Sequence, residues 1–149
     1  MSLEHHLQQQ QDRLERMVSL LEREQALLAE GKIDGEQLSA IASEKQSLFK
    51  ALEQSEATRR KAQQTLGYSL DRKGAEQAAE NAGCSTLWQT LLATTEHVAN
   101  LNTLNGQLIQ HRLQHNQQML NILQDAGGSS LYGPDGHASK TIPRVSSKA

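Results

Sequence analysis

A chain of 149 residues is long enough for one domain, and no shift in composition marks a second one. Only 36% of the residues are hydrophobic and 3% aromatic, so we expect narrow apolar stripes between helices and no deep substrate pocket. The formal net charge of −2 gives no electrostatic reason to expect nucleic acid or an anionic membrane, since both select strongly basic surfaces. Other proteins are therefore the expected partners.

Three features predict a cytoplasmic protein without membrane insertion. No apolar segment approaches the roughly 20 residues that cross a bilayer. Glu4 and a run of glutamines stand at the N-terminus, where a secretory signal would have an apolar core. Cys84 is the single cysteine and has no partner for an internal disulfide.

The first half of the chain predicts two helices. Apolar residues recur every three to four positions from Leu3 to about Ala29, and Gly31 follows as a stop signal. Asp34 with Gln37 three residues later is typical of a helix start, and we expect the second helix from Gly35 to Leu66. The first stripe comprises Leu3, Leu7, Leu14, Met17, Val18, Leu21, Leu27 and Leu28, and the second comprises Leu38, Ile41, Lys45, Leu48, Leu52, Ser55, Arg59, Ala62 and Leu66.

The second half predicts one much longer helix. Between Gly67 and Gly83 the signal is weak, with a possible short helix over Ala75–Ala82. We expect Ser85 to cap a third long helix that reaches Gly127, about 60 Å at 1.5 Å per residue. Gly106 could bend that helix, so its continuity stays open.

The fold class is therefore all-α. We predict an elongated antiparallel bundle of three long helices with a short connecting helix over residues 1–126, and a flexible Gly-, Ser- and Pro-containing C-terminal tail over 127–149. Trp88 and Phe49 lie among apolar residues, and we expect both in the core.

Candidate chemistry is sparse, and we expect no catalytic, cofactor-binding or metal site. His111 and His115 share one helix face at chelating distance, but two ligands do not make a site and no further ligand stands nearby. Cys84 has no neighbouring base that would activate it as a nucleophile. An enzyme that uses zinc through the two histidines remains the most distant hypothesis.

The end of the third long helix carries apolar residues that packing leaves unexplained. They close the intramolecular bundle, or they accept a helix from another chain, either a second copy or a different protein. Asparagine and glutamine side chains beside them offer hydrogen bonds without fixed charge. The apolar residues are Ile109, Leu113, Met119, Leu120, Ile122 and Leu123.

Three features together resemble the FlgN family of flagellar export chaperones. They are a Leu/Gln/Glu-rich pair of N-terminal helices, a long Asn/Gln-rich C-terminal helix and the tail sequence Leu131-Tyr132-Gly133-Pro134-Asp135-Gly136. The resemblance implies a cytoplasmic chaperone that binds the C-terminal segments of flagellar hook-associated proteins, its cargo, and delivers them to the flagellar type III export gate without a cofactor. It also implies that the apolar residues of the third long helix bind cargo, and that the docking residues for the gate are Leu131, Tyr132 and Gly133.

The alternative is a structural coiled-coil protein that self-associates through the same leucines and has no client. Leu7, Leu14, Leu21 and Leu28 repeat every seven residues, but the basic helix of a DNA-binding zipper is missing. A mass that depends on concentration would indicate such a homo-oligomer.

Overall fold

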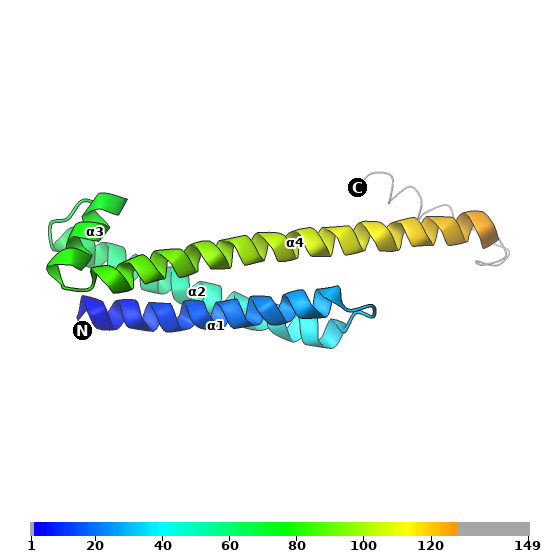
Figure 1. Ribbon diagram of the computed structural model, residues 1–149, viewed down its shortest axis with the longest axis horizontal. Helices are drawn as coiled ribbons and strands as arrows, with labels where there is room; N and C mark the ends of the chain where they lie inside the picture. Colours follow the sequence, from blue (N-terminus) through cyan, green and yellow to red (C-terminus); the bar gives the residue numbers. More distant parts are fainter. Residues whose placement is uncertain (1, 128–149) are drawn as a thin grey trace. The chain divides into compact units, whose positions relative to one another are not determined.

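Residues 2–127 are described by a computed structural model, and they form four α-helices (Figure 1). The all-helical prediction is confirmed for this part of the chain, which contains no strand. None of its helices combines the length and hydrophobicity that a bilayer crossing requires. The helices are α1 (Leu3–Ala29), α2 (Gly35–Thr65), α3 (Arg72–Asn81) and α4 (Ser85–Gly127).

The chain divides into two compact units, Met1–Asn105 and Gly106–Ala149. The first unit holds α1, α2, α3 and the beginning of α4. The described part of the second unit is the remainder of α4, and the backbone stays helical through Gly106. The elongated antiparallel arrangement of the whole chain and the boundary between a domain at 1–126 and a tail at 127–149 stay predictions.

The starts of α1 and α2 follow the side chains that cap them. The Ser2 hydroxyl accepts a hydrogen bond from the His5 N–H at 3.1 Å. Asp34 caps α2 as predicted, because its Oδ1 accepts from the Gln37 N–H at 3.0 Å. The Gln37 side chain returns to Asp34 and donates to its Oδ2 at 2.8 Å. Two of the free N–H groups in these first turns are thereby satisfied.

The predicted cap of α4 was wrong by one residue. The Cys84 carbonyl accepts from the Trp88 N–H at 3.0 Å, so Cys84 occupies the cap position and Ser85 lies in the first turn. The Cys84 N–H donates at 2.9 Å to Ala79, which belongs to the last turn of α3. One buried residue therefore follows the end of α3 and precedes the start of α4.

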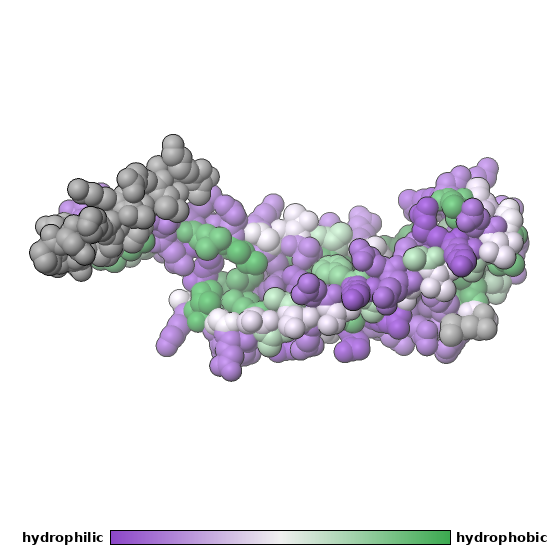
Figure 2. All heavy atoms as spheres, turned by 180° about the vertical axis from the view of Figure 1, so that it is seen from behind, coloured by the Kyte–Doolittle hydropathy of each residue, from purple (hydrophilic) through white to green (hydrophobic). Residues whose placement is uncertain are grey.

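α1 contributes more buried apolar side chains to the core of the first unit than any other helix. Leu7, Met17 and Leu21 are completely buried, as is Ile41 of α2. Each such side chain contributes roughly 1.5–3 kcal/mol to stability. From behind, hydrophilic residues cover much of the surface with apolar patches between them (Figure 2). The other helices complete the core with Leu48, Ala75, Ala79, Cys84, Trp88, Leu91 and Val98.

Long-range hydrogen bonds fix the directions of the helices in this unit. His6 contacts the Ser55 carbonyl at 3.0 Å, while Glu24 accepts from Lys45 at 3.1 Å, so α1 and α2 run antiparallel. The Gln11 side chain donates to the Thr94 hydroxyl at 2.9 Å.

Asn105 forms further long-range hydrogen bonds between α4 and the C-terminal part of α1. Its amide donates to the Leu21 carbonyl at 2.8 Å and to Glu24 Oε1 at 2.9 Å. Since Gln11 contacts Thr94 and the later Glu24 contacts Asn105, α1 and this part of α4 run parallel.

Phe49 does not lie in the core as predicted, because its side chain is 39% exposed. Successive helix residues are rotated by about 100°, and the stripe of α2 buries the preceding Leu48. The neighbouring position therefore faces outward. Trp88 is 6% exposed, which confirms the same prediction for that residue.

Arg59 organises the contact between α2 and the start of α4. Its guanidinium donates to both Glu56 oxygens at 2.9 and 2.6 Å and to Gln63 Oε1 at 2.6 Å. The guanidinium carbon lies 4.9 Å from the centroid of the Trp88 ring, within the range of a cation–π contact. Burial raises the pKa of Glu56, but the hydrogen bonds and charge of Arg59 outweigh it, and the pKa falls below its ordinary 4.5.

Gly74 permits a close approach between α3 and the segment before it. A Cβ at this position would lie 1.9 Å from the carbonyl oxygen of Ser69, which belongs to the backbone. The Gly74 N–H also donates to the capping Asp71 at 2.8 Å. Gly106 is the opposite case, because nothing lies within 4 Å of its added Cβ.

We expect Gly74→Ala to lower the free energy of unfolding by about 1–3 kcal/mol, since the methyl group forces a backbone shift. Helix propensity alone would favour alanine by about 1 kcal/mol. Gly106→Ala is the matched control, and it should leave the urea midpoint unchanged or raised. Equal midpoints for the two variants would contradict the close approach at Gly74.

We expect Glu56→Gln to cost about 0.5–1 kcal/mol at pH 7, the range of a partly exposed ion pair. The folded-state pKa of Glu56 is lowered, so its contribution is present above the ordinary value of 4.5 and is lost as the pH falls below it. The difference in unfolding free energy between wild type and variant should therefore be smaller at an acidic pH below the folded-state pKa than at pH 7. Glu76→Gln removes the more exposed Arg72 pair and serves as the control. A cost that is the same at both pH values would rule out the ion pair as its source.

Candidate functional site

The predicted cargo-binding residues all lie on the part of α4 that belongs to the second unit. Ile109 is 40% and Leu113 59% exposed, whereas Leu120 is half-buried. Steps of three and four residues place them on one side of the helix with Leu123, and Met119 lies at the edge. We call this set the α4 stripe: Ile109, Leu113, Met119, Leu120 and Leu123.

Ile122 does not share this side. It follows Leu113 by nine residues, which at 3.6 residues per turn rotates it by about 180°. Its side chain is nevertheless 58% exposed, almost the same fraction as that of Leu113. One flat partner surface cannot contact both residues, so a partner that covers Leu113 would leave Ile122 outside the contact.

The surroundings of the α4 stripe are polar but carry little charge. Between Gly106 and Gly127 the sequence contains one arginine, one aspartate and two histidines, and the other polar side chains are amides. Asn116 lies within the stripe and is exposed. Gln117 donates to Asn121 at 3.4 Å on a neighbouring face. Such amides form hydrogen bonds with many partners, and they do not select them by charge.

The histidine pair is not part of a larger metal site in the described region. His111 and His115 are both exposed on α4. No group of three or more His, Cys, Asp or Glu side chains in residues 2–127 is placed to hold a metal ion. Cys84 is buried, and burial together with the charge of Glu4 raises the pKa of its thiol. A raised thiol pKa disfavours the thiolate that a nucleophile requires.

The predicted gate-docking residues Leu131, Tyr132 and Gly133 lie outside the described residues. The first unit also contains a cavity of about 200 Å³ that the sequence did not predict, where α1, α2, α3 and α4 meet. The available signal was that Ala62 and Leu66 continue the stripe of α2. The helical spacing predicts that both pack against a neighbouring helix, whereas in the structure they line the cavity and are exposed.

Comparison with known proteins gives consistent results. Residues 1–140 match the family described as FlgN protein. The chain is 33% identical over 136 residues to the flagella synthesis protein FlgN of Yersinia enterocolitica. The aligned residues cover 91% of this chain and 88% of the relative. It is 34% identical over 121 residues to the Salmonella typhimurium protein of the same name, with 81% and 79% covered. The Escherichia coli K12 protein is 31% identical over 123 residues, with 83% and 80% covered.

No solved structure matches the chain. The family match and the three relatives each extend over most of the sequence, and the relatives share one name that refers to the synthesis of flagella. The resemblance inferred from the helices and the Tyr-Gly tail is thereby confirmed. The chain belongs to the FlgN family, which acts in flagellar assembly.

Proposed function

We propose that this protein is a cytoplasmic export chaperone that binds the C-terminal segments of flagellar hook-associated proteins through the α4 stripe. It would then deliver them to the flagellar type III export gate. The observation that carries the proposal is the exposure of the α4 stripe on an amide-rich helix of a FlgN family member. Apolar side chains repeated at helical spacing and left in water favour a partner that covers them.

The spacing of the α4 stripe favours a helical partner. An amphipathic helix places its own apolar residues at intervals of three and four, and these would meet Ile109, Leu113 and Leu120 along one line. A polar residue of the partner opposite Asn116 would satisfy its amide. Such a contact shields an aggregation-prone segment before export and needs no catalysis.

We expect Leu113→Asp to weaken binding of hook-associated C-terminal segments at least tenfold in titration calorimetry. The substitution places a charge in the middle of the α4 stripe, where a covering partner would have to desolvate it. Leu120→Asp with Leu123→Asp should abolish binding.

Ile122→Asp is the matched control, because its side chain is equally exposed and projects from the opposite side of α4. Its affinity should stay within threefold of wild type, and circular dichroism should show equal helicity for all variants. Equal losses for Leu113→Asp and Ile122→Asp would reject the α4 stripe as the binding surface. No binding by wild type would reject the chaperone function itself.

Docking at the gate is proposed for Leu131, Tyr132 and Gly133 on the basis of the family resemblance. We expect Tyr132→Ala to weaken binding to the cytoplasmic part of the gate in a pull-down of purified proteins, while cargo affinity stays unchanged. Ser129→Ala is a control substitution in the same segment. Unchanged binding of Tyr132→Ala to the gate would remove this residue from the proposal.

The second candidate function is self-association, since a second copy could also cover the α4 stripe. Sedimentation of the purified protein over a hundredfold range of concentration distinguishes the two. A mass that rises with concentration in wild type and stays low in Leu113→Asp would favour the self-associating coiled coil. A constant monomer mass together with cargo binding would favour the chaperone.

A further inference from the structure

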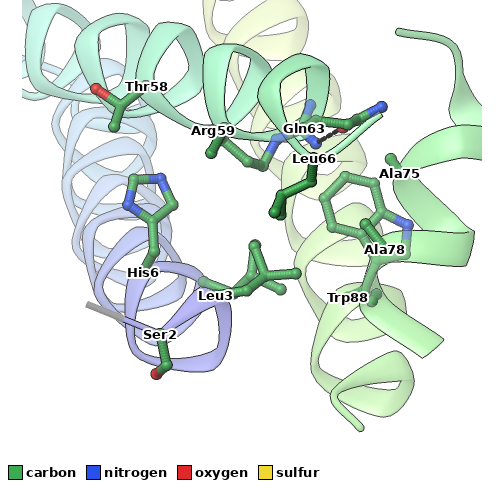
Figure 3. Close-up of a pocket in the computed structure, with 13 residues that line it drawn as sticks. Ser2, Leu3, His6, Thr58, Arg59, Gln63, Leu66, Ala75, Ala78 and Trp88 are labelled. Atoms are coloured by element: carbon green, nitrogen blue, oxygen red, sulfur yellow. Dashed lines mark hydrogen bonds between the residues drawn. The ribbon is translucent and has the colours of Figure 1, made fainter. Parts of the chain in front are cut away.

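A cavity of about 200 Å³ lies entirely within the first unit (Figure 3). Leu3 of α1, Leu66 at the end of α2 and Trp88 of α4 converge on it, and α3 contributes a wall of alanines. Small side chains leave the space open. For comparison, an apolar protein cavity of about 150 Å³ accepts benzene.

The cavity continues an interface that the fold already uses. The stripe of α2 that packs on the other helices passes through Leu48, Ser55 and Arg59, which are buried. Steps of three and four residues carry it on to Ala62 and Leu66, and both line the cavity. Beyond Arg59 the helices of this unit cover the stripe incompletely, since Ala62 is exposed and Leu66 is 70% exposed.

The electrostatics of the walls favour an uncharged occupant. Arg59 is the one lining residue with a permanent charge, and its guanidinium is already held by both oxygens of Glu56. An anionic ligand would have to compete with that carboxylate. A cation would meet Arg59 itself. The remaining walls are mainly leucine, alanine and one face of tryptophan.

We infer that this cavity is a second protein-binding site, which takes a single uncharged apolar side chain, leucine or aromatic, from a partner protein. A protein is favoured over a free small molecule because Leu66 is the most exposed of the large hydrophobic side chains in the described residues. A small molecule would fill the cavity and leave the outer part of Leu66 in water. A protein partner that inserts an anchor residue covers both, which is the usual arrangement at an interface. The inference does not depend on the α4 stripe.

The test uses the indole N–H signal of Trp88, which is the one tryptophan in the chain and gives a single proton–nitrogen NMR peak. Toluene probes the cavity, and N-acetylphenylalaninamide probes a side chain attached to a peptide backbone. Both should shift the signal saturably in the full-length protein, and N-acetylalaninamide should not.

Ala62→Leu fills the mouth of the cavity from an exposed position, so it should fold normally and reduce both shifts at least fivefold. Ala57→Leu is the matched control, since Ala57 is exposed on the same helix and does not line the cavity. It should behave as wild type.

Each other outcome overturns the inference in a defined way. No saturable shift with toluene would mean that the cavity is closed in solution. Shifts that are unchanged in Ala62→Leu would place the binding elsewhere. A shift with toluene but not with N-acetylphenylalaninamide would assign the cavity to a free small molecule and reject a protein anchor.

Discussion

Burial of the apolar side of α1 is the constraint on which the first unit depends. The composition is poor in hydrophobic residues, and three of the completely buried side chains, Leu7, Met17 and Leu21, stand at helical spacing on this one helix. The stripe of α2 and the beginning of α4 both contribute to the cluster that surrounds them. The core is narrow, because the other helices pack their apolar residues around this line of side chains. This explains how a chain with 36% hydrophobic residues forms a packed unit without a thick interior.

Polar residues interrupt that line and determine which arrangement of helices is possible. Gln11 and Glu24 occupy buried positions on α1, and their partners Thr94 and Asn105 come from α4. Leucines alone would tolerate a shift of α4 by one turn with similar burial, whereas these pairs would then lose their hydrogen bonds inside the protein. Glu24 additionally accepts from Lys45 of α2 and so joins three helices. We infer that these contacts specify the register of the unit more than they stabilise it.

The sequence was sufficient for whatever depends on local periodicity. The all-helical character, the capping pair Asp34 and Gln37 and the burial of Trp88 follow from spacing and turn chemistry, whereas the possible helix over Ala75–Ala82 begins earlier in the structure, at Arg72. Errors arose where tertiary contact decides. Cys84 and not Ser85 occupies the cap position of α4, because the Cys84 N–H bonds to the end of α3. Phe49 was predicted to be buried and is exposed, because its apolar character does not reveal which side of α2 faces a neighbouring helix. The cavity was missed for a related reason, since a periodic stripe does not show where the covering helix ends.

The two apolar surfaces differ in a manner that bears on the kind of partner each would hold. The α4 stripe is extended and lies among amides, so affinity would be distributed over several contacts, and many amphipathic helices could satisfy it. The cavity is compact, and a single inserted side chain would supply most of the contact. Extended, adaptable surfaces suit a protein that must accept and then release unfolded segments, because no single contact dominates the dissociation rate. A shaped cavity suits one specific partner. If both surfaces are used, cargo exchange at the α4 stripe could proceed while the second partner stays bound, provided that occupancy of one surface leaves the other unchanged.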